Sequence, residues 1–410
     1  IWQNILLMFV FSLIPYLTTF VANNPNSFIP QALYGLDFII VDIILYFMAQ
    51  SLLTINKEKI TQRAGEEVEV KYILDLRDFP GDPIQEKIVH DYEVIANDPE
   101  IQIVIEVMGG VEPAYTFVKR ALESGKSVCT SNKELVAKHG AELLQIAREK
   151  NINFLFEASV GGGIPVLRPL VQCLSANEIT EISGILNGTT NYILNKMIVD
   201  NMDFDTALKL AQDLGFAEKD PTADIEGHDA CRKICILAAL CFGKHVYPDG
   251  VYTEGIRKIT LSDVEYARAW GGVIKLIARA KQLEDGRVAV MVSPAFVQNH
   301  SQLASVDDVF NAILVRGDAI GDVVFYGKGA GKLPTASAVV ADVIDCAKHT
   351  ARRKSFGWGP CEENYVIDPM LQNTALYVRA KTEDYVSAFN EINKIFDSPV
   401  ILHRENEEKT

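Results

Sequence analysis

The sequence predicts an α/β protein with two main domains, the first built on a parallel sheet and the second on a mixed sheet. The chain has 410 residues, which is long enough for two or three domains. Between residues 101 and 157, short apolar runs alternate with amphipathic helical patterns, as they do in βαβ units. After residue 179, strand patterns are interspersed with helices, which favours a mixed sheet with helices on one face.

Composition narrows the function classes. Apolar residues make up 48% and charged residues 23% of the chain, as in ordinary folded globular proteins. The net charge of −15 argues against a nucleic-acid partner, since phosphate binding requires a basic face. The seven cysteines are odd in number and have no CxxC spacing, so we expect reduced thiols in a cytoplasmic protein.

Residues 1–51 do not fit the α/β pattern. The first charged residue is Asp37, and apolar runs cover 5–21 and 38–53. One interpretation is a membrane anchor, because each run is near the ~20 residues that a span needs. The other is a misframed or misjoined segment, because the chain starts with Ile1 and Gly35 is the only glycine in the first 64 residues. We favour the second interpretation and expect no membrane partner.

The first domain continues from residue 52 with alternating strands and helices. The clearest strand of this domain, Ile101–Val107, is followed by Gly109 and Gly110. Paired glycines at this place let a dinucleotide approach the backbone. An ordinary strand-to-helix turn is the alternative. At the end of the preceding strand, Arg77 would favour the 2′-phosphate of NADP, Asp75 would favour NAD, and a surface charge is equally compatible. The predicted elements are strand Glu67–Leu74, strand Ile101–Val107, helix Glu112–Ser124, strand Ser127–Thr130, and a turn at Ser131–Glu134 into another helix.

A glycine-rich segment joins the two domains. The strand Asn153–Glu157 leads into three consecutive glycines, Gly161 to Gly163, which are followed by a helix over Pro165–Leu174. Such glycines expose backbone carbonyls that suit a monovalent cation. A flexible hinge between domains is an equally good interpretation.

The second domain is predicted from a longer series of elements. The Gly327–Gly331 loop differs from a nucleotide P-loop in its spacing. The elements are strand Ile179–Leu186, a helix from Asn187, helix Phe204–Leu214, a helix from Gly227 or His228, a turn, strand and helix within Val251–Leu283, strands Arg287–Pro294 and Ile313–Tyr326, helix Ala336–Lys348, strand Thr374–Lys381 and helix Tyr385–Phe396.

The stretch Gly215–Lys233 contains the main candidate catalytic and substrate-binding residues. Asp229 and Lys233 are four residues apart and share one helix face, and Glu218 lies on the preceding loop. Carboxylates can hold an amino group and a lysine can give a proton to an oxygen, so the set suits a small zwitterionic substrate. A solvated surface pair is the plain alternative.

Three motifs in order carry a resemblance to a known family: Asn187–Tyr192, Gly215–Lys233 and Gly327–Gly331. From about Leu52 to Thr350, and more weakly to Phe396, the chain resembles bacterial homoserine dehydrogenases that carry an ACT domain. The resemblance implies a Rossmann-like nucleotide-binding domain, an α+β catalytic and dimerisation domain with a mixed sheet, and a partial ACT-like βα tail. The implied divisions are 1–51 (atypical), 52–157 (nucleotide-binding), 158–335 (catalytic and dimerisation), 336–355 (a returning helix) and 370–410 (ACT-like).

The resemblance also implies a reaction, the NAD(P)-dependent interconversion of L-homoserine and L-aspartate 4-semialdehyde in threonine, methionine and isoleucine biosynthesis. Lys233 would give a proton to the substrate oxygen and Asp229 would bind the hydroxyl or its water. Glu218 would hold the ammonium, with Thr189 and Lys133 as further substrate contacts.

The implied cofactor is NADP or NAD, with a monovalent cation, sodium, beside it in a homodimer. Residues 1–64 lack the GxGxxG fingerprint that such enzymes use for the pyrophosphate. A catalytically silent or membrane-tethered homologue is therefore the alternative. The candidate cofactor contacts are Gly109, Gly110, Lys133, Gly331 and Arg77, and the candidate cation ligands, mainly through backbone oxygens, are Glu157, Val160, Gly162 and Ile164.

Overall fold

The computed structural model describes residues 57–350, 356–396 and 398–404, and the segment 1–51 discussed above lies outside them. The chain divides into two compact units, residues 1–70 and 71–410. The described part of the first unit is a helix over 57–64 followed by an irregular segment, with an ion pair of 2.5 Å between Lys57 and Glu67. Within the described residues, no helix is both long and apolar enough to cross a membrane.

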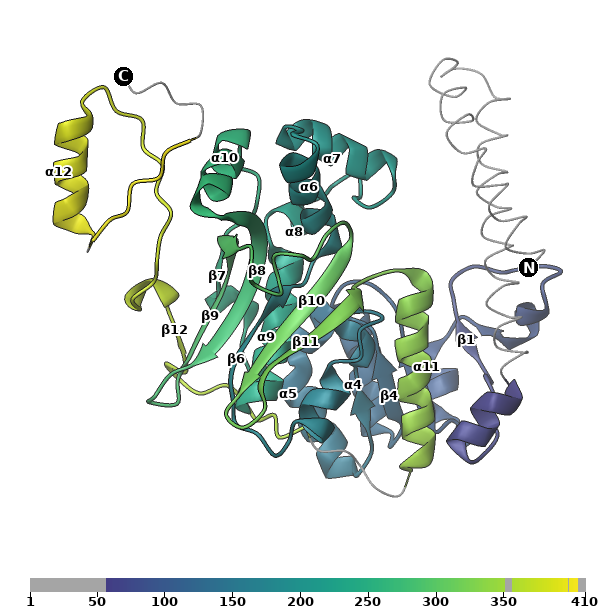
Figure 1. Ribbon diagram of the computed structural model, residues 1–410. Coiled ribbons are helices and arrows are strands. Elements are labelled where there is room, and N and C mark those ends of the chain that lie inside the picture. Colours follow the sequence, from purple (N-terminus) through teal and green to yellow (C-terminus); the bar gives the residue numbers. More distant parts are fainter. Residues whose placement is uncertain (1–56, 351–355, 397, 405–410) are drawn as a thin grey trace, which may run out of the picture. The chain divides into compact units, whose positions relative to one another are not determined.

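The second unit opens with two small parallel sheets (Figure 1). One sheet pairs β1 with β2, and the other has three strands in the order β3-β4-β5. Among the described strands, β3 pairs only with β4. Ile105 and Val107 are therefore exposed along the β3 edge. The elements are β1 (Ile73–Leu74), η1 (Pro83–Lys87), β2 (Ile88–Val89), α3 (Tyr92–Asn97), β3 (Ile103–Glu106), α4 (Ala114–Glu123), β4 (Ser127–Thr130), α5 (Lys133–Lys150) and β5 (Phe154–Leu155).

A larger mixed sheet follows. Its strand order is β11-β10-β6-β8-β9-β12, and β7 pairs with β9. The connection from the first sheet is made by η2 (Glu157–Ser159) and by the π-helical turn η3 (Pro169–Cys173). The strands are β6 (Ile179–Ile185), β7 (Tyr252–Thr253), β8 (Gly272–Gln282), β9 (Val288–Gln298), β10 (Phe310–Gly317), β11 (Gly321–Lys328) and β12 (Val366–Ile367).

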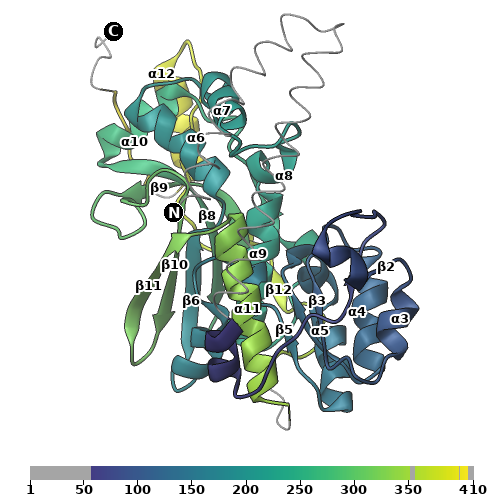
Figure 2. The same cartoon turned by 90° about the vertical axis from the view of Figure 1, so that its right-hand side faces the viewer.

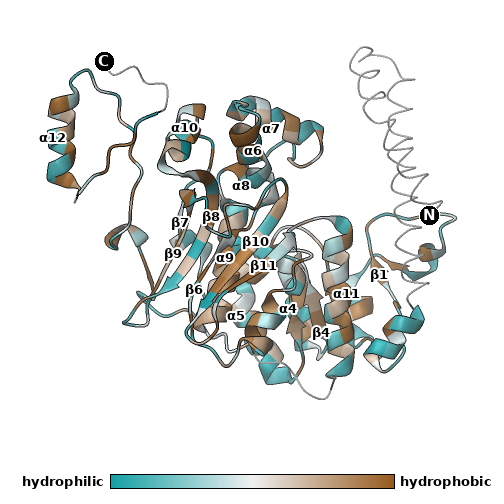
Figure 3. Cartoon of the chain, viewed as in Figure 1, coloured by the Kyte–Doolittle hydropathy of each residue, from teal (hydrophilic) through white to brown (hydrophobic). Residues whose placement is uncertain are grey.

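Helices cover this sheet and form the core with it. The central one, α9, packs against β6, β8 and β9 and buries Ile234, Leu237 and Ala238 between them. Figure 3 shows hydrophobic stretches along the ribbons of β10 and β11 in this sheet. The helices of this region are α6 (Gly188–Val199), α7 (Phe204–Asp213), α8 (Thr222–Ile225), α9 (His228–Phe242), η4 (Pro248–Gly250) and α10 (Leu261–Trp270).

The chain then returns to the first sheet and ends in an extended tail. Helix α11 (Lys332–Lys348) packs against β3 and β4 (Figure 2). The tail contains η5 (Pro369–Leu371) and α12 (Tyr385–Ile395). It is fixed to α10, because the Tyr377 hydroxyl donates to Asp263 Oδ1 at 2.9 Å.

Several predicted elements need correction. The strand predicted over Glu67–Leu74 is only Ile73–Leu74, and the strand predicted over Thr374–Lys381 is wrong, because that segment is irregular. The run Ile313–Tyr326 is not one strand: it spans most of the antiparallel hairpin β10–β11, which turns at 318–320. Within Val251–Leu283 the order is strand, helix, strand, so the sequence analysis missed β8.

Candidate active site

The site lies where the N-termini of α5 and α9 meet. Helix α5 packs on α9, and Lys133 at the start of α5 forms an ion pair of 2.5 Å with Asp229 Oδ1 in the first turn of α9. A second pair, Arg232 with Glu134 at 2.5 Å, joins the same two turns. A cation at a helix N-terminus is disfavoured by the helix dipole, so the position of Lys133 depends on the neighbouring carboxylate.

Lys233 lies one helical turn beyond Asp229. Its Nζ donates to Asp229 Oδ2 at 2.7 Å and to the Leu186 carbonyl oxygen at 2.7 Å, and its side chain is 8% exposed. A lysine ammonium has three N–H donors, so these two contacts leave one donor for a ligand oxygen. Burial lowers the pKa of Lys233, Asp229 opposes that shift, and the nearby charge of Lys133 adds to it.

Asp229 is the anionic centre of the cluster. Its carboxylate is buried, with one oxygen facing Lys133 and the other facing Lys233. Burial raises the pKa of Asp229, but the ammonium groups of Lys233 and Lys133 outweigh burial and hold the pKa well below its usual range. Asp229 is therefore ionised across the physiological pH range.

Two members of the cluster were missed from the sequence. Asn187 Nδ2 donates to Asp224 Oδ1 at 2.7 Å and to Asp229 Oδ2 at 2.8 Å. Burial raises the pKa of Asp224, the hydrogen bond from Asn187 opposes this, and the charge of Asp229 adds to it. From the sequence, Asn187 was expected only at the start of a helix, and Asp224 lies on the short helix α8, whose side-chain directions the local pattern does not fix.

The two predicted substrate contacts outside the cluster lie close to it in the chain. Thr189 is buried, and its hydroxyl donates to the Phe216 carbonyl oxygen at 2.7 Å. Glu218 follows on the same loop and is exposed, and among the described residues its carboxylate forms no ion pair. The loop is held by Gln212, whose Nε2 donates to the Glu218 carbonyl oxygen at 3.1 Å.

The double-glycine turn after β3 is tied to the same place. Asn132 precedes Lys133, and its Nδ2 donates to the Gly110 carbonyl oxygen at 2.6 Å. A Cβ atom at Gly109 would meet nothing within 4 Å, so the turn presents open backbone. Gly110 has a φ of +78°, which favours glycine there. This turn therefore meets the requirement for close approach of a dinucleotide.

A buried carboxylate braces that turn. Glu106 ends β3, and its two oxygens accept hydrogen bonds from Met108 N at 2.6 Å and from Thr130 Oγ1 at 2.5 Å. Thr130 Oγ1 in turn accepts from Asn132 N at 2.9 Å. Burial raises the pKa of Glu106, and these hydrogen bonds oppose the rise. The chain of contacts links the glycine turn to the start of α5.

Two other cofactor candidates lie on separate segments. Arg77 follows β1, is paired with Asp75 at 3.0 Å, and has a side chain that is 75% exposed. Gly331 immediately precedes α11 and has a φ of +123°.

The predicted cation segment contacts the second glycine loop. Gly163 N donates to the Lys328 carbonyl oxygen at 3.0 Å. A Cβ atom at Gly162 would lie 2.5 Å from the Gly329 carbonyl oxygen, so no larger residue fits there. Val160 and Ile164, the other two predicted ligands on this segment, are buried. The segment 160–164 and the loop 327–331 therefore form one packed unit.

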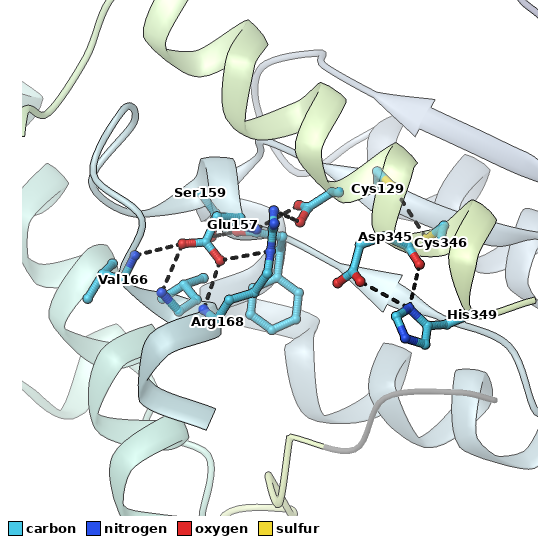
Figure 4. A network of polar contacts seen from close by, with 11 residues as sticks. Cys129, Glu157, Ser159, Val166, Arg168, Asp345, Cys346 and His349 are labelled. Atoms are coloured by element: carbon cyan, nitrogen blue, oxygen red, sulfur yellow. Dashed lines mark hydrogen bonds and ion pairs between the residues drawn. The ribbon is translucent and has the colours of Figure 1, made fainter. Parts of the chain in front are cut away.

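Glu157 is held by the chain itself (Figure 4). Its Oε1 accepts from Val166 N at 2.7 Å and Leu167 N at 3.0 Å, and its Oε2 accepts from Arg168 N at 2.8 Å. With the carboxylate engaged in this way, only the backbone oxygen of Glu157 suits a cation. Among the described residues, no three His, Cys, Asp or Glu side chains are grouped as metal ligands.

A second buried carboxylate joins this network from α11. Asp342 accepts from Arg168 Nη2 at 2.7 Å and from Glu157 N at 2.9 Å. Burial raises the pKa of Asp342 to about 7, although Arg168 and the Glu157 N–H oppose the rise. Near neutral pH Asp342 is therefore only partly ionised, and it shares the Arg168 guanidinium with Glu157.

Comparison with known proteins gives consistent matches over the two parallel sheets and most of the mixed sheet. Residues 55–157 match the family model described as homoserine dehydrogenase, NAD binding domain, and residues 165–344 match the model described as homoserine dehydrogenase. The homoserine dehydrogenase of Bacillus subtilis is 40% identical over 351 residues, which cover 83% of this chain and 80% of that protein.

Solved structures give the same result. The crystal structure of a homoserine dehydrogenase from Thiobacillus denitrificans is 40% identical, with a TM-score of 0.73, and the match covers 78% of this chain and 76% of that one. A hyperthermophilic archaeal homoserine dehydrogenase in complex with NADPH is 30% identical, with a TM-score of 0.54, over 62% of this chain and 74% of that one.

Proposed function

This chain belongs to the homoserine dehydrogenase family and is an NAD(P)-dependent oxidoreductase acting on a CH–OH group, and we propose that Lys233, Asp229 and Lys133 carry its chemistry. The observation on which this rests is the buried cluster in which one carboxylate holds two ammonium groups. The reaction interconverts L-homoserine and L-aspartate 4-semialdehyde.

Lys233 is the proton donor in the direction of aldehyde reduction. Two of its N–H groups are engaged by Asp229 and Leu186, which fixes the direction of the third. As negative charge develops on the substrate oxygen, that N–H transfers its proton, and in the reverse direction the neutral amine takes the proton back. Bound NAD(P) supplies or accepts the hydride at the carbon that bears this oxygen.

Lys133 and the carboxylates bind the substrate. Lys133 is 39% exposed, so its ammonium can contact a substrate oxygen while remaining paired with Asp229. Asp229 hydrogen-bonds to the substrate hydroxyl or its water. Glu218 holds the substrate ammonium, and Asp224 adds a second carboxylate on the same side of Asn187. Thr189 lines the same pocket next to the loop that carries Glu218.

The cofactor is NADP, held at the turns that present open backbone. Gly109 and Gly110 would contact it beside Lys133, and Gly331 would approach it from the second glycine loop. Arg77 would contact the 2′-phosphate, and the NADPH complex of the archaeal relative supports this preference. We expect Arg77→Ala to raise the KM for NADP⁺ several-fold and leave the KM for NAD⁺ unchanged.

Arg287 offers a matched control for that variant, because it forms an exposed pair with Asp285 just as Arg77 does with Asp75. Arg287→Ala is expected to change neither constant. Equal effects of Arg77→Ala on both cofactors would argue against the NADP preference.

A sodium ion would be held by backbone oxygens of Glu157, Val160, Gly162 and Ile164. The support is electrostatic, because Glu157 and Asp342 lie buried against the single charge of Arg168. Thermal unfolding in sodium chloride and in choline chloride at equal ionic strength tests this site. A higher Tm in sodium is expected, and equal Tm values would contradict it.

The protein would be a cytoplasmic homodimer. All seven cysteines are free thiols, which is typical of a reducing compartment. Strand β11 is the last strand of its sheet and exposes Tyr326, so its edge can pair with a second copy. Light scattering coupled to gel filtration is expected to give twice the mass of the chain, and a monomer mass would contradict this.

The overall proposal is tested by steady-state assays of homoserine oxidation with NADP⁺ and with NAD⁺. Turnover with both and a higher kcat/KM for NADP⁺ are expected. A purified, folded chain without turnover would favour a catalytically silent homologue.

A further inference from the structure

The Asn187 side chain links the start of α6 to two carboxylates of the site. It lies between the end of β6 and the start of α6, with extended backbone angles (φ −130°, ψ 118°). Its Oδ1 accepts from Thr190 N at 2.8 Å, which is an N-cap of α6. Since this oxygen faces a backbone N–H, the orientation of the amide is settled and Nδ2 must face the opposite way.

That nitrogen faces two carboxylates at once. Nδ2 donates to Asp224 Oδ1 at 2.7 Å and to Asp229 Oδ2 at 2.8 Å, so both amide N–H groups are engaged. A neutral donor can hold two anions side by side without competing with Lys233 for the proton. An arginine or lysine at this position would instead neutralise one of the carboxylates.

The residue before it is part of the same arrangement. Lys233 donates to the Leu186 carbonyl oxygen and to Asp229 Oδ2, the oxygen that also accepts from Asn187. One dipeptide therefore positions both the ammonium and its carboxylate. The charged groups around the amide come from three helices: Asp224 from α8, Asp229 and Lys233 from α9, and Lys133 from α5.

We propose that Asn187 is a positioning residue that keeps Asp224 ionised beside Asp229, so that Asp224 can serve as the second carboxylate of the substrate site. This inference rests on the proposed function. Without the bridging amide the two carboxylates would face each other, and like charges at short range favour protonation of one of them. The cluster would then lose one negative charge at a higher pH than the wild-type chain does.

The test uses Asn187→Ser, which keeps an N-cap oxygen but removes both amide donors. In the wild-type chain and the variant, kcat is measured from pH 5 to pH 9. The acidic limb of the variant is expected to move up by about one pH unit, so that its kcat is roughly tenfold lower at a pH within the shifted limb and recovers at higher pH. A uniform loss at every pH would overturn the inference, because a structural defect has no reason to depend on pH in this way.

Thermal unfolding gives a second readout that needs no activity. The difference in Tm between wild type and Asn187→Ser is expected to be larger at pH 8 than at pH 5, since the unbridged carboxylates repel only when both are charged. An equal difference at both pH values would also overturn the inference. Asp203→Ser, a cap exchange at the exposed start of α7, serves as the control and is expected to shift neither profile.

Failure of the proposed function would look different. A wild-type chain without turnover would contradict that function alone, and the Tm comparison would still decide the role of Asn187.

Discussion

Lys133 and Asp229 form an ion pair of 2.5 Å between the N-termini of α5 and α9. Helix α5 packs on the three-stranded parallel sheet, and α9 packs on the mixed sheet. The pair joins the helix that follows the double-glycine turn to the helix that carries Lys233. Because Asp229 also binds Lys233, removing Lys133 would change both substrate contact and the charge around the acid.

Replacing Lys133 with methionine is therefore expected to raise the KM for homoserine and lower kcat together. The combined loss in kcat/KM should reach on the order of a hundredfold, since a charged contact contributes about 1.5–3 kcal/mol and each 1.4 kcal/mol is tenfold. Steady-state kinetics measure this. Lys138→Met, at a non-catalytic position on α5, is the control, and an equal loss there would contradict a specific role.

The ionised carboxylate of Asp224 should lower the stability of the fold while it contributes to catalysis. Burial and the charge of Asp229 raise its pKa, so its ionised form costs stability at a pH above that raised value. Asp224→Asn keeps an acceptor for Asn187 and is expected to raise Tm at pH 8, with the gain shrinking as the pH falls and the carboxyl group takes up its proton.

The same variant is expected to lower kcat/KM by roughly tenfold. This corresponds to the free energy of one hydrogen bond to a charged group, about 1.5 kcal/mol. Asp220→Asn, an exposed position on the same loop, should not raise Tm. A lower Tm for Asp224→Asn at pH 8 would show that the carboxylate is not strained in the folded state.

His245 should make the fold sensitive to acid. It is fully buried, its Nδ1 accepts from Trp358 Nε1 at 3.1 Å, and burial lowers its pKa from 6.5 to about 4. A depressed pKa contributes stability that is present above pH 6.5 and is lost as the pH falls toward 4. Between pH 6.5 and pH 5 the unfolding free energy should fall by roughly 2 kcal/mol from this residue.

Urea unfolding at the two pH values measures that loss. His245→Gln cannot take up a proton and should reduce the loss, whereas His300→Gln, on an exposed turn, should leave it unchanged. If wild type and His245→Gln lose the same free energy, His245 is not the group responsible.

Glu157 should be essential for stability rather than for proton transfer. Its carboxylate accepts three backbone N–H groups, and a glutamine at this position can accept only part of that set. Glu157→Gln is expected to cost about 3 kcal/mol, as for breaking a buried charged network, measured by urea unfolding. Glu284→Gln, an exposed residue, is the control. An unchanged unfolding free energy for Glu157→Gln would contradict the assignment.

The helices and strands that depend on local periodicity could be predicted from the sequence. The start of α9 was predicted at Gly227 or His228, and the shared face of Asp229 and Lys233 follows from helical spacing. A strand before Gly109 and Gly110 and a helix entered from the turn at Ser131–Glu134 were also predicted, and β3 and α5 lie there. The contact of Lys133 with Asp229 depends on how two distant helices pack, which no local pattern specifies.

The missed elements have identifiable causes. Strand β8 was missed although Ile274, Leu276, Ala278 and Ala280 give it an alternating buried face, because the end of the Val251–Leu283 segment was predicted as a helix. In β10 and β11 the turn residues 318–320 lie between two apolar runs that look like one. Asn187 was predicted only at the start of a helix, and its contacts with Asp224 and Asp229 depend on how α8 and α9 pack around it.

The most direct test of the account is the kcat of Lys233→Met at saturating homoserine and NADP⁺. Loss of the amine that accepts the substrate proton in this direction is expected to reduce kcat by about 10²–10⁴-fold, with circular dichroism unchanged. Lys209→Met is the matched control, because Lys209 forms an exposed pair with Asp213 at the same helical spacing, and it should keep wild-type activity. Turnover near that of the wild type in Lys233→Met would contradict the account.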